Sequence, residues 1–404
     1  MASDPVREQY ETYPYPHRDP EEERTRLLEG SPSNLLEVDH YLFRGRRDWS
    51  QPFRVLVAGC GTGDGLIQLA THLQRNGFPA EILAVDLSDA SLEIARKRAE
   101  IRSLESITFQ RMDLIDAVGQ GPFDYIDCCG VLHHLEEPDA GFRALSDAVA
   151  DDGGLGLMVY APFGRAGVYE MQDVFRGLLG GLPAAEKVET AREMLADLPA
   201  HNAFAKNSLV RDHEISDAGL YDLLLHSQDR AYTVSDLVAA LNRASLSLVS
   251  FLPPAQYDFS RIVPEGLRGR ARELPPIEAM ALAEKLRGDI KVHNVYVAKS
   301  ADGHVARPTD AALRPILPAV PAVKLGEQIA RKGQFRASLP HETCVIEVPK
   351  AAGVALARAD GTRTLGQIAA ELSLDWMSFQ GLWGPLDRAL VPHGLMLYSR
   401  QVRR

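Results

Sequence analysis

Short apolar runs alternate with amphipathic segments between residues 53 and 160 of this 404-residue chain. Apolar runs that end in glycine or a polar residue are typical of buried strands, and a segment that begins at an N-cap residue such as Ser88 is typical of a helix. The pattern predicts strands at 55–58, 81–85, 107–110, 123–129 and 155–160, with helices at 65–75, 88–101 and 137–149 between them. Such alternation predicts parallel strands joined by helical crossovers.

The rhythm changes after Tyr160, where residues 161–232 are typical of loops and helices and predict a helical insertion that acts as a substrate lid. Thr233 and Asp236 then resemble a capping box that starts a helix to Arg243. A strand at 246–251, a helix at 276–286 and a strand at 291–298 follow. The whole pattern predicts an α/β fold with a doubly wound, mostly parallel sheet of seven strands.

Changes in composition divide the chain into four parts. Residues 1–50 are predicted to be an N-terminal arm, in which Tyr13-Pro14-Tyr15-Pro16 is extended because each proline disfavours a helical residue before it. This segment is either a lid over the site or an arm docked on apolar surface. Residues 51–300 form the main domain, 301–340 are a linker rich in proline and alanine, and 341–404 form a small α+β domain.

Composition and charge exclude several classes of protein. With 45% hydrophobic and 25% charged residues the chain is typical of a soluble globular protein, and no apolar stretch predicts a membrane span. The polar, acidic first residues do not resemble a secretory signal. The four cysteines form no CxxC pair, which indicates neither a disulfide framework nor structural zinc and favours the cytoplasm. Residues 1–300 carry a net charge of −15, which disfavours nucleic acid as a partner, although residues 301–404 carry +4.

A glycine loop and an acidic residue carry the strongest chemical signal. Gly59, Gly61 and Gly63 follow the first predicted strand, with the spacing G-x-G-x-G rather than the spacing of dinucleotide folds. Asp86 ends the second strand, where a carboxylate can accept hydrogen bonds from both hydroxyls of a ribose. After the third strand, Asp113 is either a contact for an adenine amino group or a solvated turn residue.

These motifs resemble those of class I S-adenosylmethionine-dependent methyltransferases. Residues 55–63 resemble the first motif of the family, Asp86 its ribose acid, Asp113 its adenine-side acid, and residues 123–135 its fourth motif. Gly153-Gly154-Leu155 resembles the turn before the fifth strand. The resemblance implies a methyltransferase with S-adenosylmethionine as cofactor and S-adenosylhomocysteine as product. The cofactor-binding residues that it implies are Ala58, Gly59, Cys60, Gly61, Gly63, Asp86, Leu87, Asp113, Leu114, Cys129 and Gly130.

One position departs from the family. Many members have an acid two residues before the first glycine, where it helps to hold the methionine amino group, and this chain has Val57 there. Another group, for example one from the N-terminal arm, must then take over this contact.

The catalytic candidates are His134 and Tyr13. Adjacent side chains on a helix point in different directions, so one of His133 and His134 is expected near the cofactor pocket and the other in packing. His213, Glu214 and His226 do not have the spacing of a standard metal motif, and no metal site is predicted.

The predicted activity is methyl transfer to an N or O nucleophile of a protein or small-molecule acceptor. The alternatives are a non-catalytic regulatory protein that binds S-adenosylmethionine, and an RNA or DNA methyltransferase. The latter is disfavoured because Cys128-Cys129-Gly130 stands where amino-directed DNA enzymes have an Asn/Asp-Pro-Pro-Tyr/Phe motif. The C-terminal domain resembles the winged-helix modules of bacterial enzymes. Such modules can also bind DNA, but no lysine-rich or arginine-rich helix is present, which favours substrate docking or dimerisation to a homodimer. No membrane partner is expected.

Overall fold

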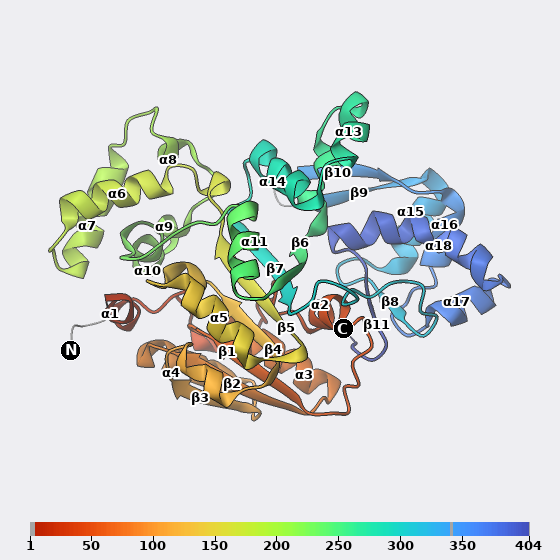
Figure 1. Ribbon diagram of the computed structural model, residues 1–404, viewed down its shortest axis with the longest axis horizontal. Coiled ribbons are helices and arrows are strands. Elements are labelled where there is room, and N and C mark those ends of the chain that lie inside the picture. The colour runs from red at the N-terminus through yellow and green to blue at the C-terminus, as the bar shows by residue number, and fades with distance from the viewer. Residues whose placement is uncertain (1–4, 340–341, 404) are drawn as a thin grey trace.

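A central sheet of seven strands organises the computed structural model, which describes residues 5–339 and 342–403. The strand order is β3-β2-β1-β4-β5-β7-β6, with β1 to β5 parallel and β7 antiparallel to both of its neighbours (Figure 1). The predicted fold class is therefore confirmed. The strands are β1 (Phe53–Ala58), β2 (Ala80–Asp86), β3 (Ile107–Arg111), β4 (Phe123–Cys129), β5 (Val149–Tyr160), β6 (Ser247–Leu252) and β7 (Val292–Ala298).

Helices cover both faces of this sheet because alternate residues of each strand point to opposite sides. Leu56 belongs to one apolar core, whereas Val55 and Val57 belong to the other. One face carries α2 (Leu35–Leu42), α3 (Asp64–Asn76) and α4 (Asp89–Ile101), and the other carries α5 (Pro138–Ala148), α11 (Val234–Arg243) and α14 (Pro276–Arg287). The short helices α12 (Phe259–Ile262) and α13 (Arg268–Arg272) lie between β6 and β7 in the chain. Among the described residues, no helix is long and apolar enough to span a bilayer.

Two glycines that were expected in a turn lie inside a strand instead. Gly153 and Gly154 belong to β5, which starts at Val149, directly after α5. A Cβ atom at Gly153 would lie 2.7 Å from the carbonyl oxygen of Asp124, so this glycine allows the two strands to approach closely.

The insertion after β5 has a small apolar core of its own. It contains α6 (Val168–Leu179), α7 (Ala184–Ala196), α8 (Ala203–Lys206), α9 (Asp212–Ile215) and α10 (Asp217–Leu220), followed by one π-helical turn at Tyr221–Leu225. Figure 1 shows it at the left end of the molecule, near α1 (Pro5–Thr12) of the N-terminal arm. The insertion and the arm, which are far apart in the sequence, therefore meet at one end of the fold.

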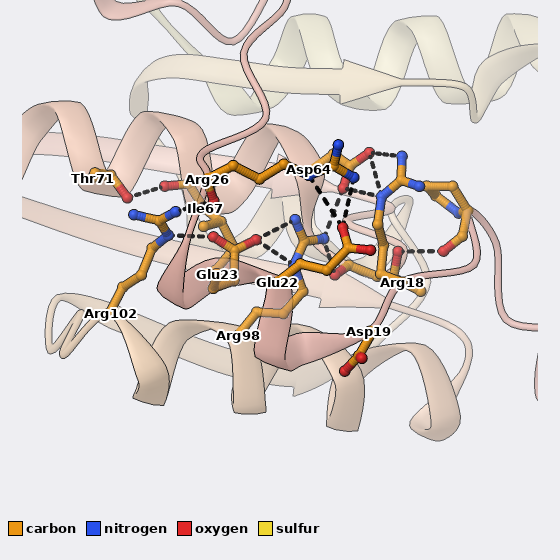
Figure 2. Close-up of polar contacts among 12 residues, drawn as sticks. Arg18, Asp19, Glu22, Glu23, Arg26, Asp64, Ile67, Thr71, Arg98 and Arg102 are labelled. Atoms are coloured by element: carbon orange, nitrogen blue, oxygen red, sulfur yellow. Dashed lines mark hydrogen bonds and ion pairs between the residues drawn. The ribbon is translucent and has the colours of Figure 1, made fainter.

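The N-terminal arm is fixed to the main domain by buried ion pairs (Figure 2). Glu23, in the 3₁₀ turn Pro20–Arg24, pairs with Arg98 of α4 at 2.7 Å, and these two side chains are 3% and 1% exposed. Arg98 also binds Asp64 at the start of α3, and Arg18 of the arm binds the same carboxylate at 2.6 Å. Removing one member of a buried ion pair leaves an uncompensated charge, which is strongly destabilising. The ion pairs therefore hold residues 18–23 of the arm against α3 and α4.

The C-terminal region forms a separate apolar core that extends from Ala306 to Tyr398. It contains β8 (Arg314–Ile316) paired with β11 (Leu397–Ser399), the hairpin of β9 (Gln334–Leu339) and β10 (Glu342–Glu347), and the helices α15 (Ala322–Lys332), α16 (Lys350–Leu356), α17 (Leu365–Glu371) and α18 (Trp376–Leu390). Segment 301–340, which the sequence predicts as a linker, thus contributes β8, α15 and β9. Its apolar residues Leu325 and Ile329 have helical spacing and are buried.

The resemblance of this region to a winged-helix module is not confirmed, and residues 341 and 404 of the predicted domain lie outside the described residues. The region is joined to the main domain through α2. The hydroxyl of Ser399 donates to Asp39 at 2.5 Å, and the backbone N–H of Tyr398 donates to Nδ1 of His40 at 3.0 Å.

Candidate functional site

A cavity of about 510 Å³ opens at the carboxyl ends of the central parallel strands. Its wall includes the glycine loop after β1, Asp86 at the end of β2 and Cys129 at the end of β4. The arm and the insertion close the other side. In open α/β sheets, ligands bind at this edge, where the strands end and the helices begin.

The glycine loop needs glycine for two different reasons. Gly59 has φ +71°, and a Cβ atom there would lie 2.3 Å from a methyl carbon of Val131. Gly61 has φ +52°, and its Cβ would lie 2.9 Å from the carbonyl oxygen of Tyr15 in the arm. The loop therefore adopts a left-handed conformation between two segments that leave no room for a side chain.

Asp86 is held in place by the backbone around it. One carboxylate oxygen accepts the N–H of Gly61 at 2.8 Å and the other accepts the N–H of Ser88 at 2.9 Å. A carboxylate has about four acceptor positions, so both oxygens keep capacity for the hydroxyls of a ligand. Burial is the largest influence on this carboxyl group and raises its pKa.

Most of the other predicted cofactor residues also line the cavity, namely Cys60, Leu87, Asp113, Leu114, Cys129 and Gly130. Asp113 additionally accepts the backbone N–H of Ile115 at 2.9 Å, so it lines the cavity and forms the turn at the same time. Two predicted residues are not part of the wall. Ala58 is fully buried in the core, and Gly63 is the N-cap of α3, where it packs against Ala95.

The arm covers the glycine loop. The hydroxyl of Thr62 donates to the carbonyl of Pro16 at 2.7 Å, and Tyr15, Pro16 and Arg18 line the cavity. At the next helix, the hydroxyl of Ser88 donates to the carbonyl of Tyr10 at 3.2 Å. The arm is thus hydrogen-bonded to the glycine loop and to the start of α4 beside the cavity, and its role as a lid stays a prediction.

Where the arm and the insertion meet in the cavity wall, two tyrosines bind one buried carboxylate. The hydroxyls of Tyr10 and Tyr160 donate to the two oxygens of Asp222 at 2.9 and 3.0 Å. Asp222 is 3% exposed, and burial raises its pKa. The sequence analysis missed Asp222 and Tyr160 as site residues because nothing in the local pattern brings residues 10, 160 and 222 together.

The backbone of Gln228 sets the protonation of two histidines next to this carboxylate. Its carbonyl oxygen lies 2.8 Å from Nδ1 of His134, so Nδ1 carries a proton and Nε2 is the acceptor nitrogen of the neutral ring. Its N–H donates to Nδ1 of His226 at 3.0 Å, so the proton of His226 is on Nε2, which lies 3.3 Å from the hydroxyl of Tyr10. The two rings stack with their centroids 3.8 Å apart.

His134, Asp222 and His226 bring potential metal ligands within 4.8 Å of one another, as do His133, His134 and Asp229. The hydrogen bonds of His226 do not suit a ligand, because a metal-binding histidine usually donates its other ring N–H, and Nδ1 of His226 accepts instead. The first cluster therefore fits a proton-transfer network better than a metal site.

His133 and Tyr13 are not part of the cavity wall. His133 is fully buried and packs against Tyr160 with ring centroids 3.9 Å apart, whereas His134 lines the cavity. Tyr13 stacks on Tyr221 of the insertion at 5.2 Å and is not part of the cavity wall. In the arm, Tyr10 and Tyr15 occupy the position that the sequence analysis gave to Tyr13.

The cavity fits a nucleoside with an amino-acid tail. Asp86 provides acceptors for ribose hydroxyls, and Gly59, Cys60 and Gly61 of the loop line the cavity beside it. Leu87 and Leu114 provide an apolar wall for a base. The set of donors and acceptors therefore agrees with S-adenosylmethionine.

Comparisons with known proteins agree with this geometry. A methyltransferase domain family matches residues 56–155. An uncharacterized protein from Synechococcus sp. is 31% identical over 304 residues, which cover 72% of this chain and 70% of that protein. The solved structure of PKMT2 from Rickettsia typhi in complex with AdoHcy superposes with a TM-score of 0.59 at 16% identity, covering 96% of this chain and 76% of that one, and so shows the same fold.

Relatives with a named activity match over shorter segments. The ubiquinone biosynthesis O-methyltransferase of Neisseria meningitidis is 31% identical over 126 residues, 30% of this chain and 48% of that protein. The magnesium-protoporphyrin O-methyltransferase of Rhodobacter capsulatus is 37% identical over 95 residues, 23% of this chain and 38% of that protein. The chain thus spans less than half the length of these two relatives. Family, fold and cavity agree that the chain belongs to the seven-stranded, Rossmann-like S-adenosylmethionine-dependent methyltransferases and that S-adenosylmethionine is its cofactor.

Proposed function

We propose that the protein methylates a hydroxyl oxygen of a small acceptor, with His134 as the general base. The observation that carries this proposal is the hydrogen bond from Nδ1 of His134 to the carbonyl of Gln228 at 2.8 Å. This bond makes Nδ1 the donor, so the acceptor nitrogen of the neutral ring is Nε2, on a side chain that lines the cavity. A hydroxyl nucleophile arrives protonated, so its methylation needs a group that removes the proton.

When bound, S-adenosylmethionine supplies an electrophilic methyl group on a sulfonium whose leaving group is a neutral thioether. The protein then has to align the acceptor and keep water away. In the proposal, Nε2 of His134 takes the hydroxyl proton while the acceptor oxygen bonds to the methyl carbon and the sulfur keeps the electron pair of the broken bond. The pair Tyr10 and Tyr160, fixed on Asp222, forms the wall beside the acceptor.

The size of the cavity supports a small acceptor. Its volume of about 510 Å³ has to hold the cofactor as well, which leaves room for a small molecule or a single side chain. The two named relatives are O-methyltransferases, which supports oxygen rather than nitrogen as the nucleophile. Cytoplasmic location and a homodimer stay predictions.

The test is transfer of a labelled methyl group from S-adenosylmethionine to a cell extract that is then separated into small-molecule, protein and nucleic-acid fractions. We expect label in the small-molecule fraction, and clearly less label when the Asp86→Ala protein is used at a cofactor concentration near the Kd of the native protein. Label confined to the protein fraction would move the acceptor to a side chain. Label confined to nucleic acid would contradict the proposed acceptor class.

A further inference from the structure

Asp127 is a carboxylate in the cavity wall that no motif identifies. It lies on β4, is 2% exposed, and shares the cavity with the glycine loop. Val57 of β1 is its direct partner in the parallel ladder. Paired residues of neighbouring strands project on the same face, about 5 Å apart. Asp127 therefore stands one strand away from the position where many family members have an acid and this chain has valine.

The partners of Asp127 are neutral. The thiol of Cys129 donates to one oxygen at 3.1 Å, and the hydroxyl of Tyr125 lies 3.4 Å from the other. Within residues 5–339 and 342–403, no salt bridge includes Asp127. A buried carboxylate without a cation is costly to ionise, and burial raises the pKa of Asp127 accordingly. A ligand that brings a positive charge would remove this cost.

A glycine of α3 lets Ser33 pack close to Asp127 in the wall of the cavity. A Cβ atom at Gly65 would lie 3.5 Å from Oδ1 of Asp127 and 2.4 Å from the hydroxyl oxygen of Ser33. Gly65, Ser33 and Asp127 all line the cavity. The carboxylate is thus accessible from the cavity although solvent scarcely reaches it.

The other acids near the glycine loop are already engaged. Asp64 is paired with Arg18 and Arg98, and Asp86 is bound by two backbone N–H groups. Glu29 binds His72 at 2.9 Å, and its side chain is 53% exposed. Among the described residues on this side of the cavity, Asp127 is therefore a buried carboxylate that is bound by neutral side chains and by neither a cation nor a backbone N–H.

We infer that Asp127 binds the ammonium group of the methionine part of the cofactor, in place of the acid that is absent at position 57. The inference rests on S-adenosylmethionine as the cofactor. A charge-assisted hydrogen bond joins the ammonium to the carboxylate and keeps Asp127 ionised. The ammonium group of the cofactor is thus bound by a residue of β4 rather than by one at the end of β1.

The test compares S-adenosylhomocysteine with its analogue that lacks only the amino group, using calorimetry on the native protein and on Asp127→Asn. We expect Asp127→Asn to bind S-adenosylhomocysteine at least about tenfold more weakly and the deaminated analogue within about twofold of the native protein. Binding of the analogue also shows that the variant is folded. Glu29→Gln is the matched control and should bind both ligands like the native protein.

Equal weakening of both ligands by Asp127→Asn would overturn the inference and make Asp127 a support of the cavity wall. Unchanged binding of S-adenosylhomocysteine would overturn it as well. If Asp127→Asn does not fold, Asp127→Ser replaces it with a smaller polar side chain, and the same difference between the two ligands is expected. A native protein that binds neither ligand would instead refute the cofactor on which the proposed function rests.

Discussion

The two ends of the cavity are built in different ways. The cofactor end consists of adjacent strand ends and their loops, and its central carboxylate, Asp86, is bound by the backbone of residues 61 and 88. The end that we propose for the acceptor combines Tyr10 of the arm, Tyr160 of β5 and Asp222 of the insertion, which meet only in the folded chain. The sheet determines the geometry of the cofactor end, so this end can be shared by a whole family. The segments that pack on the sheet determine the other end, which can therefore vary with the acceptor.

The largest effect should follow from a change at the acceptor end. His134→Gln removes the proposed base, and the rate of methyl transfer should fall by about 10²–10⁴-fold. Affinity for S-adenosylhomocysteine should stay within about twofold, because the cofactor end is unchanged. Turnover with the acceptor found in the labelling experiment, together with calorimetry, measures both quantities.

The neighbouring histidine supplies the control for this change. His133 is fully buried, and neither of its ring nitrogens has a hydrogen-bond partner among the described residues. His133→Phe keeps an aromatic ring against Tyr160 and should leave the rate within about tenfold of the native value. Equal losses in the two variants would mean that His134 contributes packing rather than proton transfer.

A change at the cofactor end should affect binding first. Asp86→Ala removes the acceptor for the ribose hydroxyls, and affinity for S-adenosylmethionine should fall at least about tenfold, a loss of about 1.4 kcal/mol. Calorimetry gives the affinity directly. Asp89→Ala, at an exposed acid of α4, should bind normally, and unchanged binding by Asp86→Ala would disprove the ribose contact.

The smallest effects should distinguish two tyrosines of the arm. Tyr10→Phe removes a hydrogen bond to the buried Asp222 and should reduce turnover about tenfold, since a hydrogen bond to a charged group contributes about 1.5–3 kcal/mol. Tyr13→Phe keeps the ring stacked on Tyr221 and should stay within about twofold. Initial rates at saturating cofactor measure the difference. A larger loss of turnover in Tyr13→Phe than in Tyr10→Phe would mean that the hydroxyl of Tyr13, rather than that of Tyr10, contacts the reacting groups.

Much of the cofactor end was predictable from local patterns. The strands β1 to β5, the glycine loop and Asp86 follow from hydrophobic periodicity and from residues that are close together in the sequence. The boundaries were less predictable. Gly153 and Gly154 continue β5 rather than precede it. Glycine is needed at position 153 because a Cβ atom would collide with the backbone of the neighbouring strand, whereas the sequence pattern alone also fits a tight turn.

The sequence by itself determined the order of strands and helices, and with it the edge of the sheet where a nucleoside binds, because those signals are local. Only the tertiary structure decided which distant side chains share the cavity. Asp127 lines the cavity because β4 pairs with β1 in a register that places it beside Val57. Asp222 lines the cavity because the insertion packs against the arm, where Tyr10 binds it. The folding of residues 306–339 into the C-terminal core was settled in the same way, since burial depends on contacts between segments that no local pattern encodes.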